Sequence, residues 1–185
     1  MHQYTWNSRT EILSADQVKD IRIELVNYDP SGQLQHTLLN DQPASTLPLG
    51  FLRRAIAEDK KKEMQQYLTG LQGLLEQYTL PTTGKIFDFI MGAKPSGPDA
   101  NGQFEISGFN VVQPGDNLNL WINPWTRHVS HIQVNTTFQG SAVQLSATFA
   151  TLAGSGLNYV SFAEATVPAK QLSVQVQNYN YSRPN

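Results

Sequence analysis

The side chains that could bind a metal or catalyse a reaction lie far apart in this sequence. His128 and His131 are the closest pair of histidines, and His2 and His36 have no histidine near them. Residues three apart on a β-strand point to opposite faces of the sheet, so this pair would chelate one ion only if a bulge rotated one of them. The histidine spacing therefore predicts no metal site.

The carboxylates and serines form no catalytic pattern either. Asp88 and Glu105 are isolated, whereas paired acid–base catalysis needs a second group at a suitable distance. Ser155 lies between two glycines, which does not match the G-x-S-x-G pattern of a nucleophile elbow, and the sequence has no glycine-rich phosphate loop. We therefore expect neither an enzyme nor a cofactor. An enzyme would need two of the following side chains to converge in one cleft: His36, Asp88, His128, His131 and Glu164.

The composition excludes several classes of protein. The 185 residues include no cysteine, so disulfides, thiolate catalysis and cysteine-bound metals are excluded. The 13 Lys and Arg residues and 15 Asp and Glu residues give a net charge of -2, which supplies no basic field for nucleic acid. No apolar run approaches the roughly 18 residues of a membrane span, so no transmembrane segment is expected.

Three antiparallel strands are predicted between Asp116 and Leu152. Apolar and polar residues alternate over 118–122, 131–138 and 143–149, which is the pattern of half-buried strands. Pro124 and Gly140 mark the two turns between them. This meander has one apolar face that another part of the chain must cover.

More strands are predicted on both sides of this meander. Similar alternation brings the total to about nine, over residues 4–12, 21–28, 33–39, 103–112, 159–167 and 172–177. Residues 41–48 are predicted to form a linker, and the Pro- and Gly-rich residues 93–102 a loop.

Two helices are predicted between the third and fourth strands. From 49 to 80, apolar residues recur at three- and four-residue steps, as in an amphipathic helix. Gly70 and Gly73 within it indicate a kink or a close approach to the sheet. Residues 85–91 are apolar almost all round and predict a short, buried helix. The sequence thus predicts a single α+β domain, 1–185. Its curved antiparallel sheet forms an incomplete β-barrel, and a helical unit of about 49–91 covers the concave face.

The one-sided apolar pattern predicts a hydrophobic ligand between the sheet and the helices. The inner face of the sheet is expected to carry Trp6, Ile23, Leu120, Ile122, Ile132, Val134, Phe138, Leu145 and Phe149. The helices are expected to face them with Leu71, Leu75, Phe87 and Ile90.

Four segments resemble the bacterial lipoprotein-localisation-factor superfamily, the LolA- and LolB-like proteins. They are YTWNSRTEI, LVNYDPSGQLQHTLL, LNLWINPWTRHVSHIQVNTTFQG and VPAKQLSVQVQNYNY. The opening YTW-x-x-R-T-E and the long charged helix are similar to those of other bacterial envelope proteins. Two features differ from the superfamily: no helix precedes the first strand, and the long helix exceeds the usual lid.

The resemblance implies an incomplete barrel with a helical lid that binds acyl chains or lipoproteins in the periplasm. The sequence enters a strand almost directly after Met1, as a mature exported protein without its signal peptide would, or as a domain excerpt would. The alternative is a structural or interaction module with a filled core. Its partner surface would be the outer sheet face, with Trp121 and Trp125 as anchors.

Overall fold

The computed structural model of the protein describes residues 3–43, 51–80 and 83–183. Three strands precede two helices, and seven strands follow them. In chain order the elements are β1 (Thr5–Ser14), β2 (Gln17–Tyr28), β3 (Leu34–Pro43), α1 (Phe51–Thr79), α2 (Thr83–Gly92), β4 (Lys94–Pro98), β5 (Phe104–Phe109), β6 (Asn117–Asn123), β7 (His128–Phe138), β8 (Ser141–Thr151), β9 (Asn158–Val167) and β10 (Leu172–Ser182). A 3-10 turn, Pro168–Lys170, joins β9 to β10.

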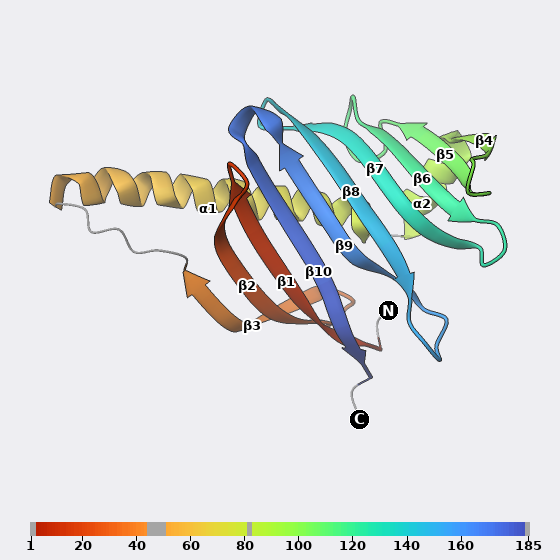
Figure 1. The fold of residues 1–185 in the computed structure, drawn as a ribbon, viewed down its shortest axis with the longest axis horizontal. Helices are drawn as coiled ribbons and strands as arrows, with labels where there is room; N and C mark the ends of the chain where they lie inside the picture. Colours follow the sequence, from red (N-terminus) through yellow and green to blue (C-terminus); the bar gives the residue numbers. More distant parts are fainter. Residues whose placement is uncertain (1–2, 44–50, 81–82, 184–185) are drawn as a thin grey trace.

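All ten strands form one antiparallel sheet, in the order β3-β2-β1-β10-β9-β8-β7-β6-β5-β4. The first and last strands pair inside the sheet, and β3 and β4 are its edges (Figure 1). The two helices therefore connect one edge to the other. At 1.5 Å per residue, the 29-residue α1 is about 43 Å long.

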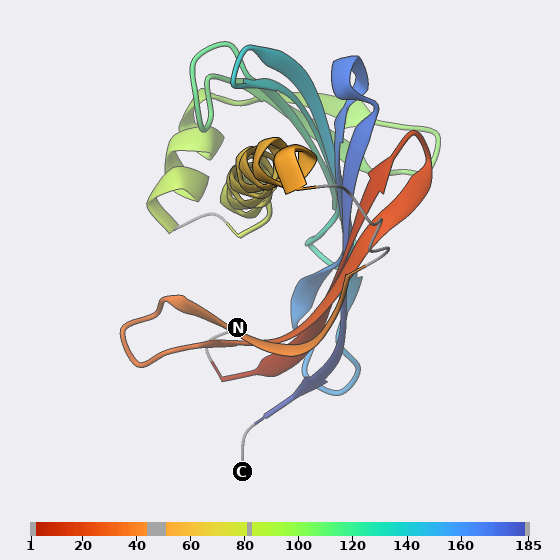
Figure 2. The same cartoon turned by 90° about the vertical axis from the view of Figure 1, so that its left-hand side faces the viewer.

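The sheet is strongly curved, and both helices lie in its concavity (Figure 2). Because β3 and β4 do not pair with each other, the barrel stays open. The predicted α+β fold, with a curved antiparallel sheet and a helical cover, is confirmed. The predicted linker is replaced by β3 as far as Pro43, and residues 44–48 and the predicted helix start at Leu49 lie outside the described residues.

The core lies between α1 and the middle of the sheet. One stripe of α1 is buried against inner-face residues of β7 to β10. The stripe consists of Tyr67, Leu71, Leu74, Leu75 and Tyr78, and the strand residues include Ile132, Val134, Val143, Leu145, Ala163, Ala165 and Val174. The small alanines of β9 let the helix approach that strand closely.

Two glycines make room for aromatic rings in this core. A Cβ atom on Gly70 would lie 2.5 Å from Cζ of Phe138, and one on Gly108 would lie 2.6 Å from Cε2 of Phe89. The close approach predicted for α1 is therefore found at Gly70, whereas a Cβ on Gly73 would have no neighbour within 4 Å. Gly108 of β5 likewise leaves room for the ring of Phe89, and this allows α2 to pack against β5.

The prediction that residues 93–102 form a loop is wrong in part. This segment contains the edge strand β4, which pairs with β5 at Lys94, Pro95 and Pro98. Two prolines within five residues hide this strand from a propensity argument, because proline lacks the N–H of a ladder bond and is tolerated only at an edge. The sheet therefore has ten strands rather than nine.

Candidate functional site

Three cavities lie in a row between α1 and the concave face. The first, which we call the apolar cavity, has a volume of about 220 Å³ and lies between β6–β8, the loop before β6 and the two helices. Its walls are mainly hydrocarbon, from Phe89, Val112, Leu118, Leu120, Ile132 and Phe149. Ile86 of α2 also lines it and is 44% exposed, so α2 forms its boundary with solvent.

A buried polar cluster fixes one wall of the apolar cavity. The carboxylate of Asp116 accepts hydrogen bonds from the Tyr78 hydroxyl (2.6 Å) and from the backbone N–H groups of Val111 (2.6 Å), Val112 (2.8 Å) and Gln113 (3.0 Å). Burial alone would raise the pKa of Asp116, but these hydrogen bonds hold it below its usual value. Burial, and then the bond to Asp116, raises the pKa of Tyr78. The cluster ties the end of α1 to the loop before β6.

The second cavity, which we call the narrow cavity, has a volume of about 40 Å³. It lies between the C-terminal half of α1 and strands β1, β2, β3, β9 and β10, and its walls include Trp6, Val26, Leu75 and Val160. The rings of Trp6 and Tyr181 stack at 5.4 Å between centroids, and Tyr181 also meets Tyr159 at 4.3 Å. Burial raises the pKa of Tyr181.

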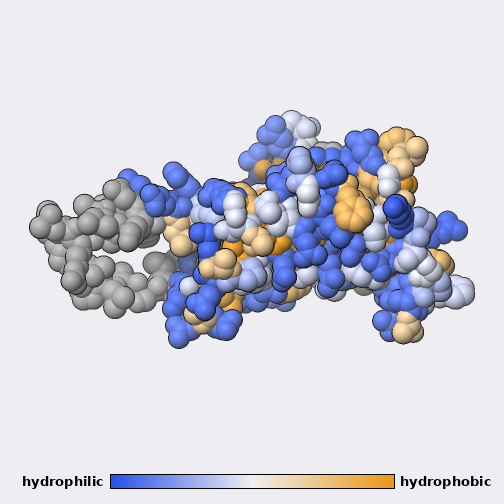
Figure 3. Space-filling view, turned by 90° about the horizontal axis from the view of Figure 1, so that it is seen from above, coloured by the Kyte–Doolittle hydropathy of each residue, from blue (hydrophilic) through white to orange (hydrophobic). Residues whose placement is uncertain are grey.

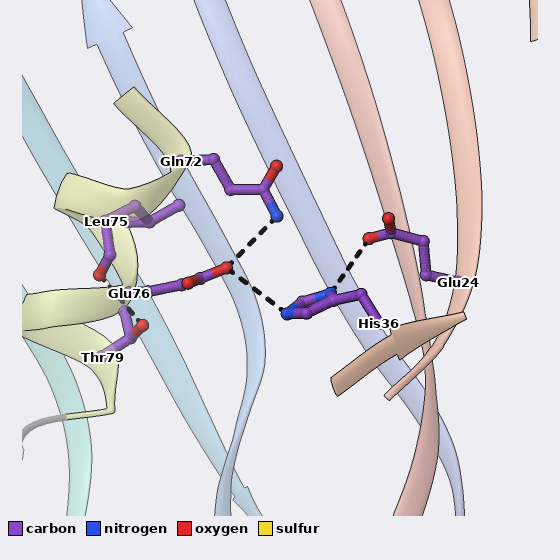
Figure 4. A network of polar contacts seen from close by, with 6 residues as sticks. All are labelled: Glu24, His36, Gln72, Leu75, Glu76 and Thr79. Atoms are coloured by element: carbon purple, nitrogen blue, oxygen red, sulfur yellow. Dashed lines mark hydrogen bonds and ion pairs between the residues drawn. The ribbon is translucent and has the colours of Figure 1, made fainter. Parts of the chain in front are cut away.

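A chain of polar contacts links the β2–β3 hairpin to α1 beside the narrow cavity (Figure 4). Nδ1 of His36 lies 3.2 Å from Oε2 of Glu24, and its Nε2 lies 4.0 Å from Oε1 of Glu76. Gln72 also donates to Oε1 of Glu76 (3.2 Å). The hydrogen bond between His36 and Glu24 raises the pKa of His36 and lowers that of Glu24.

The third cavity, which we call the polar cavity, has a volume of about 240 Å³ and lies between β1–β2 and the middle of α1. Polar side chains dominate its walls: Thr10, Asp20, Arg22, Gln65, Thr69 and Gln72. Ile12, Leu68 and Val174 complete the lining.

The three cavities share wall residues and so follow one another along α1. Gln72 lines both the polar and the narrow cavity, and Thr79 lines both the narrow and the apolar cavity. The strands repeat this order, because Thr10 of β1 lines the polar cavity and Ser8 the narrow one. Val160 and Phe149 are cross-strand partners, and they line the narrow and the apolar cavity respectively.

Many of the predicted ligand-lining residues lie on the concave side. Leu120, Ile132 and Phe149 line the apolar cavity, and Trp6 and Leu75 line the narrow one. Leu71, Val134 and Leu145 are buried in the core, and Phe138 packs against it. Half-buried Ile122 pairs with Phe104 and Val129. That any of these residues contacts a ligand stays a prediction.

Three of the residues predicted to line the ligand site do not face the space between the sheet and the helices. Ile23 pairs with Arg9, one position away from the inward-facing Glu24 and Val26, so it lies on the convex face. Phe87 and Ile90 of α2 are 62% and 60% exposed, because Phe89 is the residue of this helix that is buried against the sheet. The surface at the end of the molecule that carries α2 and β5 accordingly shows apolar side chains (Figure 3).

The polar cavity escaped prediction from the sequence. Strand β2 carries Ile21, Ile23 and Leu25 on one face and Asp20, Arg22 and Glu24 on the other, and the usual rule places the apolar set inside. The register with β1 reverses this, since Trp6 pairs with Val26 and Thr10 with Arg22. The signal was present in β1, where Ser8 and Thr10 continue the face of Trp6.

The side chains that an enzyme would need to bring together, including His128, His131 and Glu164, do not meet in one cleft of the described structure. Nδ1 of His128 lies 2.9 Å from Oγ1 of Thr151, and His131 packs against Trp121 at 5.3 Å between ring centroids. Glu164 accepts hydrogen bonds from Ser173 and Gln175. The described part of the chain contains no group of three or more potential metal ligands, and no helix in it is both long and apolar enough to cross a membrane.

Comparison with known proteins gives matches only among solved structures, where two chains match. No family model matches the sequence, and no curated protein matches it. The crystal structure of a LolA superfamily protein from Nitrosomonas europaea aligns over 98% of this chain and 86% of that one, with a TM-score of 0.44 and 10% sequence identity.

Proposed function

We propose that this protein binds the hydrocarbon chain of a lipid or lipoprotein in the apolar cavity, as a non-enzymatic protein of the bacterial envelope. The observation that carries this proposal is the cavity itself. It has a volume of about 220 Å³, is lined almost entirely by apolar side chains, and lies between a curved sheet and two helices. Burial of a hydrocarbon chain there would contribute about 0.8 kcal/mol per methylene group.

The size of the cavity fits part of a chain rather than a whole lipid. Apolar cavities of about 150 Å³ already bind benzene in engineered proteins, so 220 Å³ accommodates several methylene groups. Ile86 is half-exposed at the cavity wall, and the neighbouring apolar surface of α2 leads from it to solvent. The apolar cavity therefore borders solvent beside α2.

The envelope location and the absence of catalysis belong to the proposal as well. They follow from the resemblance of the sequence segments to lipoprotein-localisation factors. Fractionation of a bacterium that expresses the complete natural gene would test the location. Recovery in the cytosol alone would contradict that part.

Native mass spectrometry of the purified protein, followed by organic extraction, tests the binding directly. We expect an added mass that matches an acyl-chain compound, and uptake of a fluorescent fatty acid at micromolar concentration by delipidated protein. An apo mass together with no uptake of the probe would refute the proposed function.

A second candidate rests on Trp125 in the turn between β6 and β7. This indole is 91% exposed, whereas Trp121, expected to be an anchor beside it, is half-buried against His131. Exposed tryptophans are over-represented among residues that dominate protein interfaces. If the protein is an interaction module, Trp125→Ala abolishes capture of its partner in a pull-down and leaves Tm unchanged, and Trp121→Ala does not reproduce this.

A further inference from the structure

The polar cavity contains buried polar atoms that no protein group satisfies. Thr10 is only 5% exposed, and its Oγ1 has no hydrogen-bond partner. Oδ1 of Asp20 is also buried without a partner. An unsatisfied buried polar atom lowers the stability of the fold, so two of them in one cavity indicate a place that a polar ligand fills.

The charges in this cavity are separate and opposite in sign. Asp20 and Arg22 are two residues apart on β2, and both line the cavity. The ion pairs among the described residues include neither of them. The charge of Arg22 also helps to lower the pKa of Glu24, two residues further along the strand. A carboxylate and a guanidinium on one strand face, both outside the ion pairs found among the described residues, suit a ligand that carries one cation and one anion.

The order of the charges gives the orientation of such a ligand. Towards the narrow cavity, the inward residues of β2 run from Asp20 through Arg22 and Glu24 to Val26. Glu24 is already bonded to His36, so Arg22 is the inner and Asp20 the outer of the two charges that lie outside the ion pairs of the described residues. In a phosphoethanolamine or phosphocholine head group the phosphate is on the side of the hydrocarbon tail and the ammonium group is at the outer end, which is the same order.

We infer that the polar cavity binds the zwitterionic phosphate-containing head group of the lipid whose tail occupies the apolar cavity. This inference rests on the proposed function. Arg22 receives the phosphate, Asp20 the ammonium group, and Thr10 donates to a phosphate oxygen. At 1.5 Å per residue Gln72 and Thr79 are about 10 Å apart along α1, so an extended tail reaches from one cavity into the other through the narrow cavity. Since that passage holds only about 40 Å³, the 4.0 Å contact between His36 and Glu76 has to widen.

Three surfactants with the same dodecyl tail test the inference: dodecylphosphocholine, dodecyl sulfate and dodecyltrimethylammonium. Their affinities are measured by displacement of a fluorescent fatty acid, below the micelle concentration and where near-ultraviolet circular dichroism shows intact protein. We expect the unmodified protein to bind the zwitterion at least about tenfold more tightly than either single charge. Equal affinities for all three would overturn the head-group inference and leave the proposed function standing. No binding of any of them, or of the fatty acid, would refute both.

Variants locate the preference in the polar cavity. Asp20→Asn is expected to move the preference towards dodecyl sulfate, and Arg22→Gln towards dodecyltrimethylammonium. Lys19→Gln is the matched control, because Lys19 is exposed on the same strand and bonds only to Gln17 among the described residues. Thr10→Val is a third variant with conserved shape, expected to lower affinity for the zwitterion and for dodecyl sulfate but not for dodecyltrimethylammonium. Preference that survives all three cavity variants would overturn the inference.

Discussion

The two ends of the concave face solve the problem of buried polar groups in opposite ways. Beside the apolar cavity, the one buried carboxylate, Asp116, accepts four hydrogen bonds at 2.6–3.0 Å. In the polar cavity, Thr10 and Asp20 each keep a buried oxygen without a partner. Satisfied groups hold a fold together, whereas unsatisfied ones cost stability until a ligand arrives. The Asp116 cluster is therefore a structural part of the site, whereas the polar cavity has the unsatisfied groups expected of a ligand-binding part.

The largest effect is expected at Asp116. Asp116→Ala would leave three backbone N–H groups and the Tyr78 hydroxyl without their acceptor, so we expect a loss of about 3 kcal/mol or more in the free energy of unfolding. Asp99→Ala is the control, since Asp99 accepts similar bonds from the N–H groups of Asn101 and Gln103 in an exposed turn. It should cost under about 1 kcal/mol. Urea unfolding measures the free energy of unfolding of both variants. Equal losses in the two variants would contradict the structural role of Asp116.

The carboxylate of Asp116 should also make the stability of the protein depend on pH in the acid range. Its pKa is depressed in the folded protein, so its contribution is fully present above the unfolded value of 3.8 and is lost as pH falls through the lower, folded pKa. We expect Asp116→Asn to flatten the decline of Tm in this acid range relative to the unmodified protein. An unchanged acid profile would mean that Asp116 does not supply it.

Filling the apolar cavity should block hydrocarbon binding without unfolding the protein. Val129 is half-buried and lines the cavity, so Val129→Trp is expected to weaken binding of a fluorescent fatty acid at least about tenfold, since the indole would occupy the space of the chain. Val18→Trp is the control, because Val18 is 42% exposed on β2. If both variants bind as the unmodified protein does, the chain lies elsewhere.

An exchange of hydroxyl and methyl groups tests the comparison in both directions. Thr10→Val removes an unsatisfied hydroxyl and should raise the free energy of unfolding by about 1 kcal/mol. Val134→Thr places a hydroxyl in the packed core, where Val134 is 1% exposed, and should lower it by about 1–2 kcal/mol. Urea midpoints measure both changes. A destabilised Thr10→Val variant would show that the hydroxyl has a partner.

The smallest effect is expected at His36, between the two ends. The hydrogen bond to Glu24 raises the pKa of His36, so this contribution is full below the unfolded value of 6.5 and is lost as pH rises through the folded pKa. The depressed pKa of Glu24 adds stability above 4.5 that is lost in acid. The link is therefore strongest between these values, and we expect it to contribute less than about 1 kcal/mol. His36→Gln, followed by thermal unfolding from pH 5 to 8, should remove the dependence near neutral pH; a persistent dependence would implicate another group.

Much of the fold could be predicted because most strands follow the simple alternation of apolar and polar residues. The meander 116–152 and the stripe of α1 were predictable for this reason, as were Leu120 and Ile132 at the apolar cavity. Strand β4 was not, since its prolines are typical of loops. Phe87 and Ile90 were misplaced because a helix that is apolar all round does not reveal its buried face.

The polar cavity could not be predicted because alternation gives two faces but not which of them is inside. In β2 the inner face is the charged one, and only pairing with β1 decides this. The register of a strand depends on partners distant in sequence, here on the facing residues Thr10 and Ile12 and on α1 above them. A local pattern therefore finds a hydrophobic wall more readily than a polar one.

The pairing of the first strand with the last also bears on how the chain folds. Thr5 and Ser182 are partners although 177 residues separate them, whereas the other neighbouring strands are joined by short turns or by β-hairpins. Closing so long a loop has a high entropic cost and is therefore slow. We expect the β1–β10 pairing, which we call the seam, to be the last part of the sheet to form. Thr10 faces Val176 and Ile12 faces Val174 across that seam, so the polar cavity forms only at this step. A ligand present during refolding would then act on the final kinetic phase and leave the earlier ones unaltered.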